Sequence, residues 1–243
     1  METRALGKEI KSPSYFNKDS STPDTQESLV IGSRDMAPQL PYIISGGTNT
    51  EHYYFLHISN VTDYKFHVKP EYFGNESKYT SAFQKRIKKI LEKDLDATIF
   101  CVFDWDTIYN NKTNQEKHNS FVKDIKIELD AGRVILCPSM PCIEYWFLLH
   151  FQDYPNLIMK CGKELQDLLT PHMISYFPGT KLKLLRTLKK KLHVDNPDWV
   201  KNLCADNKLK DAIKRAKETI AQSEANGNLQ QHSYSYIYKI FDK

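Results

Sequence analysis

At the centre of the chain stands Ala97-Thr-Ile-Phe-Cys-Val-Phe-Asp-Trp-Asp106, an apolar run that ends in two carboxylates. A run of this kind is typical of a strand buried on both faces of a parallel sheet. Because residues two apart on a strand point to the same side, we expect Asp104 and Asp106 to converge at its carboxyl end, where open α/β sheets bind ligands. Like charges held together need a cation or a raised pKa. Since hard cations prefer oxygen ligands, the pair predicts a Mg²⁺ or Mn²⁺ site.

Around this run the chain divides into three parts. Residues 1–37 are polar and lack sustained periodicity, which predicts a flexible tail. In residues 38–156, predicted strands alternate with predicted helices, the pattern of a mainly parallel four-stranded α/β sheet with flanking helices. Residues 157–243 show only helical patterns, which predicts a C-terminal helical extension packed on the sheet. The four strands are expected at residues 41–45, 64–68, 97–103 and 133–137.

The composition is that of an ordinary globular protein, since 40% of the 243 residues are hydrophobic and 26% are charged. A formal net charge of +4 is too small to identify a polyanionic partner by itself. No long apolar run and no N-terminal signal core are present, so we expect no membrane span and a cytoplasmic location. The five cysteines include no CxxC pair, and we interpret them as reduced core thiols.

Two further acids are expected at the same edge of the sheet. Glu51 lies just beyond the first predicted strand, and Glu144 lies in the first turns of the helix after the fourth. In a parallel sheet every strand-to-helix turn emerges on one edge, so these side chains can share a cleft with Asp104 and Asp106. A structural role is the alternative, because the dipole at a helix N-terminus also favours a carboxylate. The cluster interpretation makes all four acids candidate metal ligands and catalytic residues.

A basic run in the predicted helical extension is a candidate nucleic-acid-binding surface. Lysine and arginine side chains spaced along a helix can track a phosphate backbone. The alternative is the solvated face of an amphipathic helix. The residues concerned are Lys181, Lys183, Arg186, Lys189 and Lys190.

Three segments resemble the RloB-like proteins, a bacterial TOPRIM-type family associated with phage defence and restriction loci. They are Tyr42-Ile-Ile-Ser-Gly-Gly-Thr-Asn-Thr-Glu-His-Tyr-Tyr-Phe55, Val102-Phe-Asp-Trp-Asp106 and Ser139-Met-Pro-Cys-Ile-Glu-Tyr-Trp-Phe-Leu-Leu-His-Phe151. The likeness runs from about residue 41 to the C-terminus. Its most specific part is the segment around Glu144, because a pair of aspartates two positions apart is by itself a weak signal.

The resemblance implies a TOPRIM-like fold, Mg²⁺-dependent action on nucleic-acid phosphodiesters and partnership with an ATPase encoded nearby. By motif position, Asp104 and Asp106 correspond to the TOPRIM aspartate pair. Glu51 corresponds to the second acid of the first motif, and Glu144 to the acid of the Pro-to-His-Phe motif. Assembly of several copies into a homo-oligomer is compatible with these expectations.

The chain departs from the family where the first strand ends. The family has a Glu-Gly pair there, whereas this chain has Gly46-Gly47, so the glutamate that would serve as metal ligand or general acid/base is missing. Two hypotheses follow: a metal-dependent nuclease of an anti-phage defence system, and a catalytically impaired nucleic-acid-binding or regulatory subunit of a defence complex with an ATPase. Phosphoryl transfer on a small nucleotide is a third, because carboxylates do not identify the organic part of a substrate.

Overall fold

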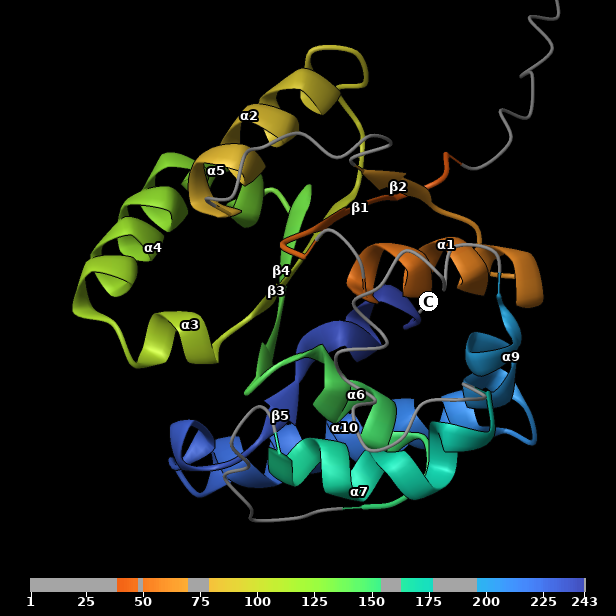
Figure 1. The fold of residues 1–243 in the computed structure, drawn as a ribbon. Helices are drawn as coiled ribbons and strands as arrows, with labels where there is room; N and C mark the ends of the chain where they lie inside the picture. The colour runs from red at the N-terminus through yellow and green to blue at the C-terminus, as the bar shows by residue number, and fades with distance from the viewer. Residues whose placement is uncertain (1–38, 48–49, 70–78, 154–162, 177–195, 243) are drawn as a thin grey trace, which may run out of the picture. The chain divides into compact units, whose positions relative to one another are not determined.

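The computed structural model describes residues 39–47, 50–69, 79–153, 163–176 and 196–242 (Figure 1). Residues Pro38–Lys243 form one compact unit. The tail predicted for residues 1–37 lies outside the described residues, so its flexibility stays a prediction.

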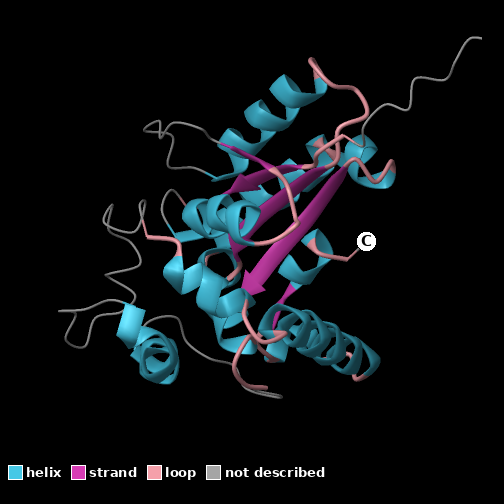
Figure 2. Ribbon diagram, turned by 90° about the vertical axis from the view of Figure 1, so that its right-hand side faces the viewer, coloured by secondary structure: helices cyan, strands magenta, loops and turns pink. Residues whose placement is uncertain are grey.

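The core of the fold is a mixed sheet with strand order β2-β1-β3-β4-β5 (Figures 1 and 2). The first four strands in sequence are parallel, and β5 runs antiparallel to β4. The apolar run containing Asp104 forms β3, with β1 and β4 on either side, as the sequence predicts for a buried central strand. The strands are β1 (Tyr42–Ser45), β2 (His67–Lys69), β3 (Ile99–Asp104), β4 (Val134–Met140) and β5 (Tyr234–Ser235).

The prediction of four strands is wrong by one. β5 lies in a tyrosine-rich segment in which helical periodicity predicts a helix, and a 3₁₀ helix follows it instead of an α-helix. A two-residue strand is too short to leave an alternating pattern. It forms because Tyr234 and Ser235 pair with Met140 and Ser139, and the hydroxyls of Ser139 and Ser235 are 2.8 Å apart.

Helices cover both faces of the sheet (Figure 2). None of them, within the part of the chain that the structure describes, has the length and apolar character needed to cross a lipid bilayer. The α-helices are α1 (Thr50–Val61), α2 (Tyr79–Leu91), α3 (Asp106–Tyr109), α4 (Lys112–Asp124), α5 (Lys126–Asp130), α6 (Ile143–Leu149), α7 (Lys163–Met173), α9 (Asp198–Cys204) and α10 (Lys208–Ala225). The 3₁₀ helices are η1 (Ile174–Tyr176), η3 (Leu229–Gln231) and η4 (Tyr236–Ile240).

Alternate side chains of β3 belong to two different cores. Phe100 and Val102 pack in a cluster with residues of α1, α6, α9 and α10. Cys101 and Phe103 pack in a second cluster with residues of α2 and α4. Because β3 is covered on both faces, its side chains are apolar along its whole length until Asp104, which explains the uninterrupted hydrophobic run.

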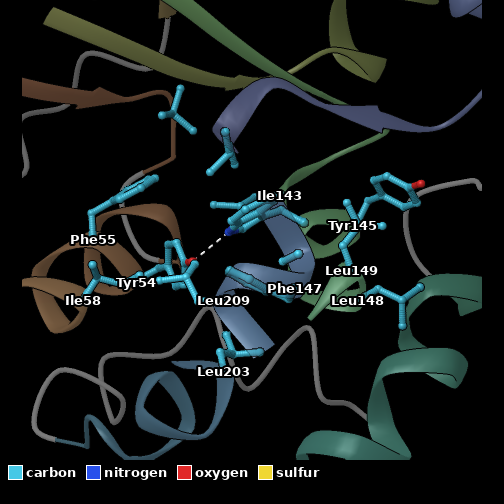
Figure 3. Close-up of a cluster of buried hydrophobic side chains, with 14 of the residues drawn as sticks. Tyr54, Phe55, Ile58, Ile143, Tyr145, Phe147, Leu148, Leu149, Leu203 and Leu209 are labelled. Atoms are coloured by element: carbon cyan, nitrogen blue, oxygen red, sulfur yellow. Dashed lines mark hydrogen bonds between the residues drawn. The ribbon is translucent and has the colours of Figure 1, made fainter. Parts of the chain in front are cut away.

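Helix α6 is buried on every side and is tied to α1 (Figure 3). Its seven residues are all buried, including the charged Glu144. The indole N–H of Trp146 donates a hydrogen bond of 2.7 Å to the hydroxyl of Tyr54 on α1, and the ring of Phe147 packs against Tyr54. A buried indole N–H without this partner would carry its full desolvation penalty. The two helices that carry Glu51 and Glu144 are therefore fixed relative to each other.

The interpretation of the cysteines holds for three of the four that the structure describes. Cys101, Cys137 and Cys204 are free. Cys142 is disulfide-bonded, which corrects the prediction of a reduced thiol, and its partner is not among the described residues. Sequence spacing gives no sign of this bond because disulfide partners are selected by distance in the fold.

Candidate functional site

The two aspartates of the central run lie where β3 leaves the sheet. Asp104 is paired with Ser139 at the end of β4. Beyond the strand, the N–H of Trp105 donates to the carbonyl of Ser139 at 2.8 Å, and the N–H of Asp106 donates to the carbonyl of Pro141 at 3.2 Å. The segment that carries both carboxylates is thus held against the connection between β4 and α6.

Asp104 also joins the sheet to α6. Its Oδ1 accepts a hydrogen bond of 2.9 Å from the backbone N–H of Ile143. The N-cap residue of α6, Cys142, makes no capping bond with its side chain. Asp104 therefore satisfies one of the backbone N–H groups that a helix leaves open at its start, and it does so from a different element.

Glu51 and Glu144 occupy equivalent places on two helices. Glu51 lies in the first turn of α1, directly after β1, and is 7% exposed. Glu144 lies in the first turn of α6, directly after β4, and is 5% exposed. Carboxylates are rarely buried to this extent without a partner or a shifted pKa. Their burial distinguishes them from ordinary solvent-exposed acids near a helix N-terminus.

The effects of the other three acids on the pKa of Asp104 indicate that all four lie near one another. Burial raises the pKa of Asp104 well above its ordinary value, and the negative charge of Glu51 raises it further. Glu144 and, more weakly, Asp106 act in the same direction, while the hydrogen bond from Ile143 lowers the pKa. The four predicted site residues thus share one region at the carboxyl edge of the parallel strands. Their role as ligands or catalysts stays a prediction.

The chemistry of these side chains fits a hard divalent cation. All four offer carboxylate oxygens, which Mg²⁺ and Mn²⁺ prefer. Within the described ranges, no three His, Cys, Asp or Glu side chains are already arranged to hold one ion. Mg²⁺ commonly uses only one or two protein carboxylates and keeps several waters, so a closed cage is not required. A cation would offset both causes of the raised pKa of Asp104, its burial and the negative charges of the neighbouring acids.

The turn after β1 makes room for Glu51. A Cβ atom at Gly47 would overlap the carboxylate of Glu51, which lies directly against this glycine. A Cβ atom at Gly46 would instead be 3.4 Å from the Cβ of Phe103 and 3.5 Å from the carbonyl oxygen of Val102, which are ordinary contacts. Gly47 is therefore needed for the position of Glu51, whereas Gly46 has space for a side chain.

Polar side chains that the sequence did not single out brace the segment after β3. The hydroxyl of Thr107 donates to the carbonyl of Asp104 at 3.2 Å, and the amide of Asn110 donates to the carbonyl of Asp106 at 3.2 Å. The amide of Asn114 on α4 donates to the carbonyl of Thr107 at 2.8 Å. These bonds satisfy backbone groups of a short exposed helix, α3. The sequence signal for these contacts is the group of asparagines at positions 110, 111 and 114.

Histidines near the site are buried and neutral in character. His118 on α4 packs edge-on against Trp105, with ring centroids 4.9 Å apart, and burial lowers its pKa. His150 lies in the core beyond α6, where its Nδ1 is 2.9 Å from the carbonyl oxygen of Trp146. Burial lowers the pKa of His150 to about 3. His150 is therefore a core residue and not a proton carrier of the site.

The basic surface predicted from the sequence lies outside the described residues. Its members are Lys181, Lys183, Arg186, Lys189 and Lys190. On α10, by contrast, several cations have partners within the fold. Arg215 donates to the carbonyl of Leu149 at 2.6 Å, and Lys208 donates to the side chain of Asn202 at 2.8 Å. These two cations stabilise the helical part of the molecule.

Comparison with known proteins identifies the family. The family model described as RloB-like protein matches residues 42–243, which is most of the chain. The chain therefore belongs to the RloB-like family, in agreement with the resemblance of its motifs. None of the curated proteins and none of the solved structures compared with the chain matches it.

We predict that Asp104→Asn stabilises the metal-free protein at neutral pH, by about 1 kcal/mol as is typical of a single substitution, because the raised pKa of Asp104 means that the fold disfavours its charge. Asparagine keeps an acceptor for the N–H of Ile143 and removes a charge that three other acids repel. Because the folded-state pKa is raised, the wild type is most stable below the unfolded-state pKa and loses stability as pH rises toward the folded-state pKa. The stability of Asp104→Asn relative to the wild type should therefore increase as the pH rises from the unfolded-state pKa of Asp104 toward its folded-state pKa.

Urea unfolding in EDTA at several pH values measures this difference. The control is Asp96→Asn, which changes an exposed aspartate in a turn. A variant that is less stable than the wild type at neutral pH would show that the charge of Asp104 stabilises the fold.

We predict different effects at two adjacent glycines. In Gly47→Ala the new methyl group displaces the carboxylate of Glu51, which is the end of a flexible side chain, so stability should fall by only about 1 kcal/mol. The pKa of Asp104 should fall as well, because the charge of Glu51 moves away. Gly46→Ala should change stability by about 0.5 kcal/mol or less. Thermal unfolding and carbon-detected NMR titration of Asp104 measure both effects. Equal behaviour of the two variants would contradict the placement of Glu51.

Proposed function

We propose that this RloB-like protein is a metal-dependent nuclease with a TOPRIM-like site, acting on nucleic-acid phosphodiesters in a bacterial anti-phage defence system. The observation that carries the proposal is geometric: Asp104 at the end of β3 accepts a hydrogen bond from the first turn of α6, and the buried Glu51 and Glu144 lie in the first turns of α1 and α6. Burial and the charges of these acids raise the pKa of Asp104. Buried acids that repel one another destabilise a fold, and such arrangements cluster at functional sites. Membership of the RloB-like family supports the same function.

In this proposal Asp104, Asp106 and Glu51 hold Mg²⁺ or Mn²⁺, and Glu144 holds a second ion or orients the attacking water. A bound ion would polarise a phosphoryl oxygen and lower the pKa of a bound water. Asp104 must release its proton before it can act as a ligand, so metal affinity should rise as the pH approaches its raised pKa. Two hydrogen bonds keep these ligands in place, one from the N–H of Ile143 in α6 to Asp104 and one from the N–H of Asp106 to the carbonyl of Pro141.

The glycine at position 46 favours a second candidate function. Without the carboxylate that the family resemblance places there, the site can bind a cation and nucleic acid and still lack a group needed for cleavage. The chain would then be a nucleic-acid-binding or regulatory subunit of a defence complex, controlled by an ATPase. A cytoplasmic location and association with further copies of the chain are compatible with both functions.

Cleavage assays with the purified chain test the first function. Plasmid DNA, single-stranded DNA and RNA are incubated with Mg²⁺ or Mn²⁺, alone and with an ATPase encoded nearby. We expect cleavage that EDTA abolishes and that Asp104→Ala reduces by about 10²-fold or more, as for loss of an essential catalytic group. The control is Glu116→Ala, an exposed acid of α4. If cleavage survives Asp104→Ala, the reaction takes place at another site of the protein or is due to a contaminating nuclease.

Restoring the missing acid separates the two functions. A glutamate at position 46 begins with a Cβ atom in ordinary contact with Phe103 and Val102, so Gly46→Glu should fold. If the carboxylate is the lacking group, this variant should cleave roughly 10²-fold faster than the wild type, the usual contribution of a general acid or base. Gly46→Gln is the matched control, with the same shape and no charge. An equal rate for the two variants would contradict the idea that an acid is lacking.

A further inference from the structure

A row of aromatic side chains begins beside the carboxylates. We call it the aromatic strip; its members are Trp105, Tyr234, Tyr236 and Tyr238. Trp105 stands between Asp104 and Asp106 in the chain and packs against the buried cluster that contains Tyr234, and so do the other two tyrosines. Ring centroids are 5.7 Å apart for Tyr234 and Tyr236, and 6.3 Å apart for Tyr236 and Tyr238. Trp105 and the tyrosines are thus joined through the buried cluster of Met140, Ile220 and Tyr234, in which Met140 of β4 is paired with Tyr234 of β5.

Three members of the strip keep part of their surface in water. Trp105, Tyr236 and Tyr238 are partly exposed, whereas Tyr234 is 5% exposed and anchors the row. The other two tryptophans of the chain, Trp146 and Trp199, are at most 1% exposed. Most other large aromatic residues of the described sheet and helices are buried, so the strip is an exception to the packing of this fold. Through Trp105, which stands between Asp104 and Asp106 in the chain, it adjoins the candidate site.

Two lysines lie over the tyrosine rings. The Nζ of Lys239 is 4.6 Å from the ring centroid of Tyr236, and the Nζ of Lys217 is 5.8 Å from that of Tyr238. Acids are present as well. Lys217 also pairs with Asp242 at 2.6 Å, and the hydroxyl of Tyr236 donates to Glu224 at 2.7 Å. Lys239 is the cation that we assign to a phosphate. It lies over one face of the Tyr236 ring, so its side chain must move toward the phosphate before a base can stack on that face. The bond to Glu224 holds the hydroxyl of Tyr236 and so keeps the orientation of the ring.

We propose that the aromatic strip binds unpaired nucleotides of a single-stranded nucleic acid and leads the strand to the carboxylates. This inference rests on the proposed nuclease function and names its substrate class. Aromatic rings that stack on bases, together with a cation for the backbone, are the usual means of binding single strands without sequence preference. A duplex cannot use the strip, because its bases are already stacked on one another and do not present their faces.

Trp105 gives a direct signal for this binding. As the partly exposed tryptophan of the three, it is the one whose fluorescence a stacked base can quench. Oligothymidylate and oligouridylate of about 16 nucleotides, long enough for one binding site, are titrated in EDTA, and a DNA duplex of the same length is titrated in parallel. We expect saturable quenching by either or both single strands and at least tenfold weaker binding of the duplex. The two single strands distinguish DNA from RNA.

Variants of the strip test whether stacking causes the binding. Tyr238→Leu should weaken single-strand binding about tenfold, whereas Tyr238→Phe, which keeps the ring, should bind like the wild type. Trp105→Phe should lose the fluorescence change and keep the affinity, which anisotropy of a labelled strand measures. Lys239→Gln should reduce the dependence of binding on salt concentration. Circular dichroism verifies that each variant is folded.

The results separate this inference from the proposed function. Absence of quenching, equal quenching by the duplex, or equal affinity of Tyr238→Leu and Tyr238→Phe would overturn it, even if the protein cleaves nucleic acid. A concentration-dependent dimer that Tyr238→Leu abolishes would likewise overturn it, because the strip would then be a protein interface. Failure of cleavage with every metal and substrate would refute the nuclease function, and the EDTA titrations would still report on the strip.

Discussion

The hydrogen bond between Asp104 and the first turn of α6 is the interaction on which the arrangement of the site depends. It joins the end of the central strand to a helix that is buried on every side. The partner of Asp104 is a backbone N–H, so the bond requires an acceptor at this position and no particular residue at position 143. Because α6 also carries Glu144, the same bond holds the acid of the Pro-to-His-Phe motif close to the central pair of aspartates.

A second hydrogen bond, between α6 and α1, fixes the position of the remaining acid, Glu51. Trp146 on α6 donates to Tyr54 on α1, and α1 carries Glu51 in its first turn. Gly47 leaves the space that the carboxylate of Glu51 occupies. The core of the protein therefore positions three charged segments that repel one another. Repulsion of this kind lowers stability, and a fold retains it where the charges serve a purpose that packing alone does not.

The region around the candidate site combines two kinds of chemistry that suit a phosphodiester substrate. The carboxylates suit a divalent cation, and the adjacent aromatic residues suit the bases of an unpaired strand. Asn110, at the end of α3, and Asn114 on α4 brace α3, because their amides donate to the backbone carbonyls of Asp106 and Thr107. Side chains that are held on strands and helices and braced in this way are fixed in position by the fold itself.

The sequence by itself determined the central strand, the alternation of parallel strands and helices, and the four acids at one edge of the sheet. These features follow from the hydrophobic periodicity of each segment and from the alternation of predicted strands and helices, both of which can be recognised in short stretches of sequence. Only the tertiary structure decided that β5 completes the sheet, that Cys142 is disulfide-bonded, that Gly47 accommodates Glu51 and that Arg215 and Lys208 on α10 have partners in the fold. Each of these features depends on contacts between residues far apart in the chain or on the space around one atom. Such contacts and spaces leave no periodic pattern in the sequence.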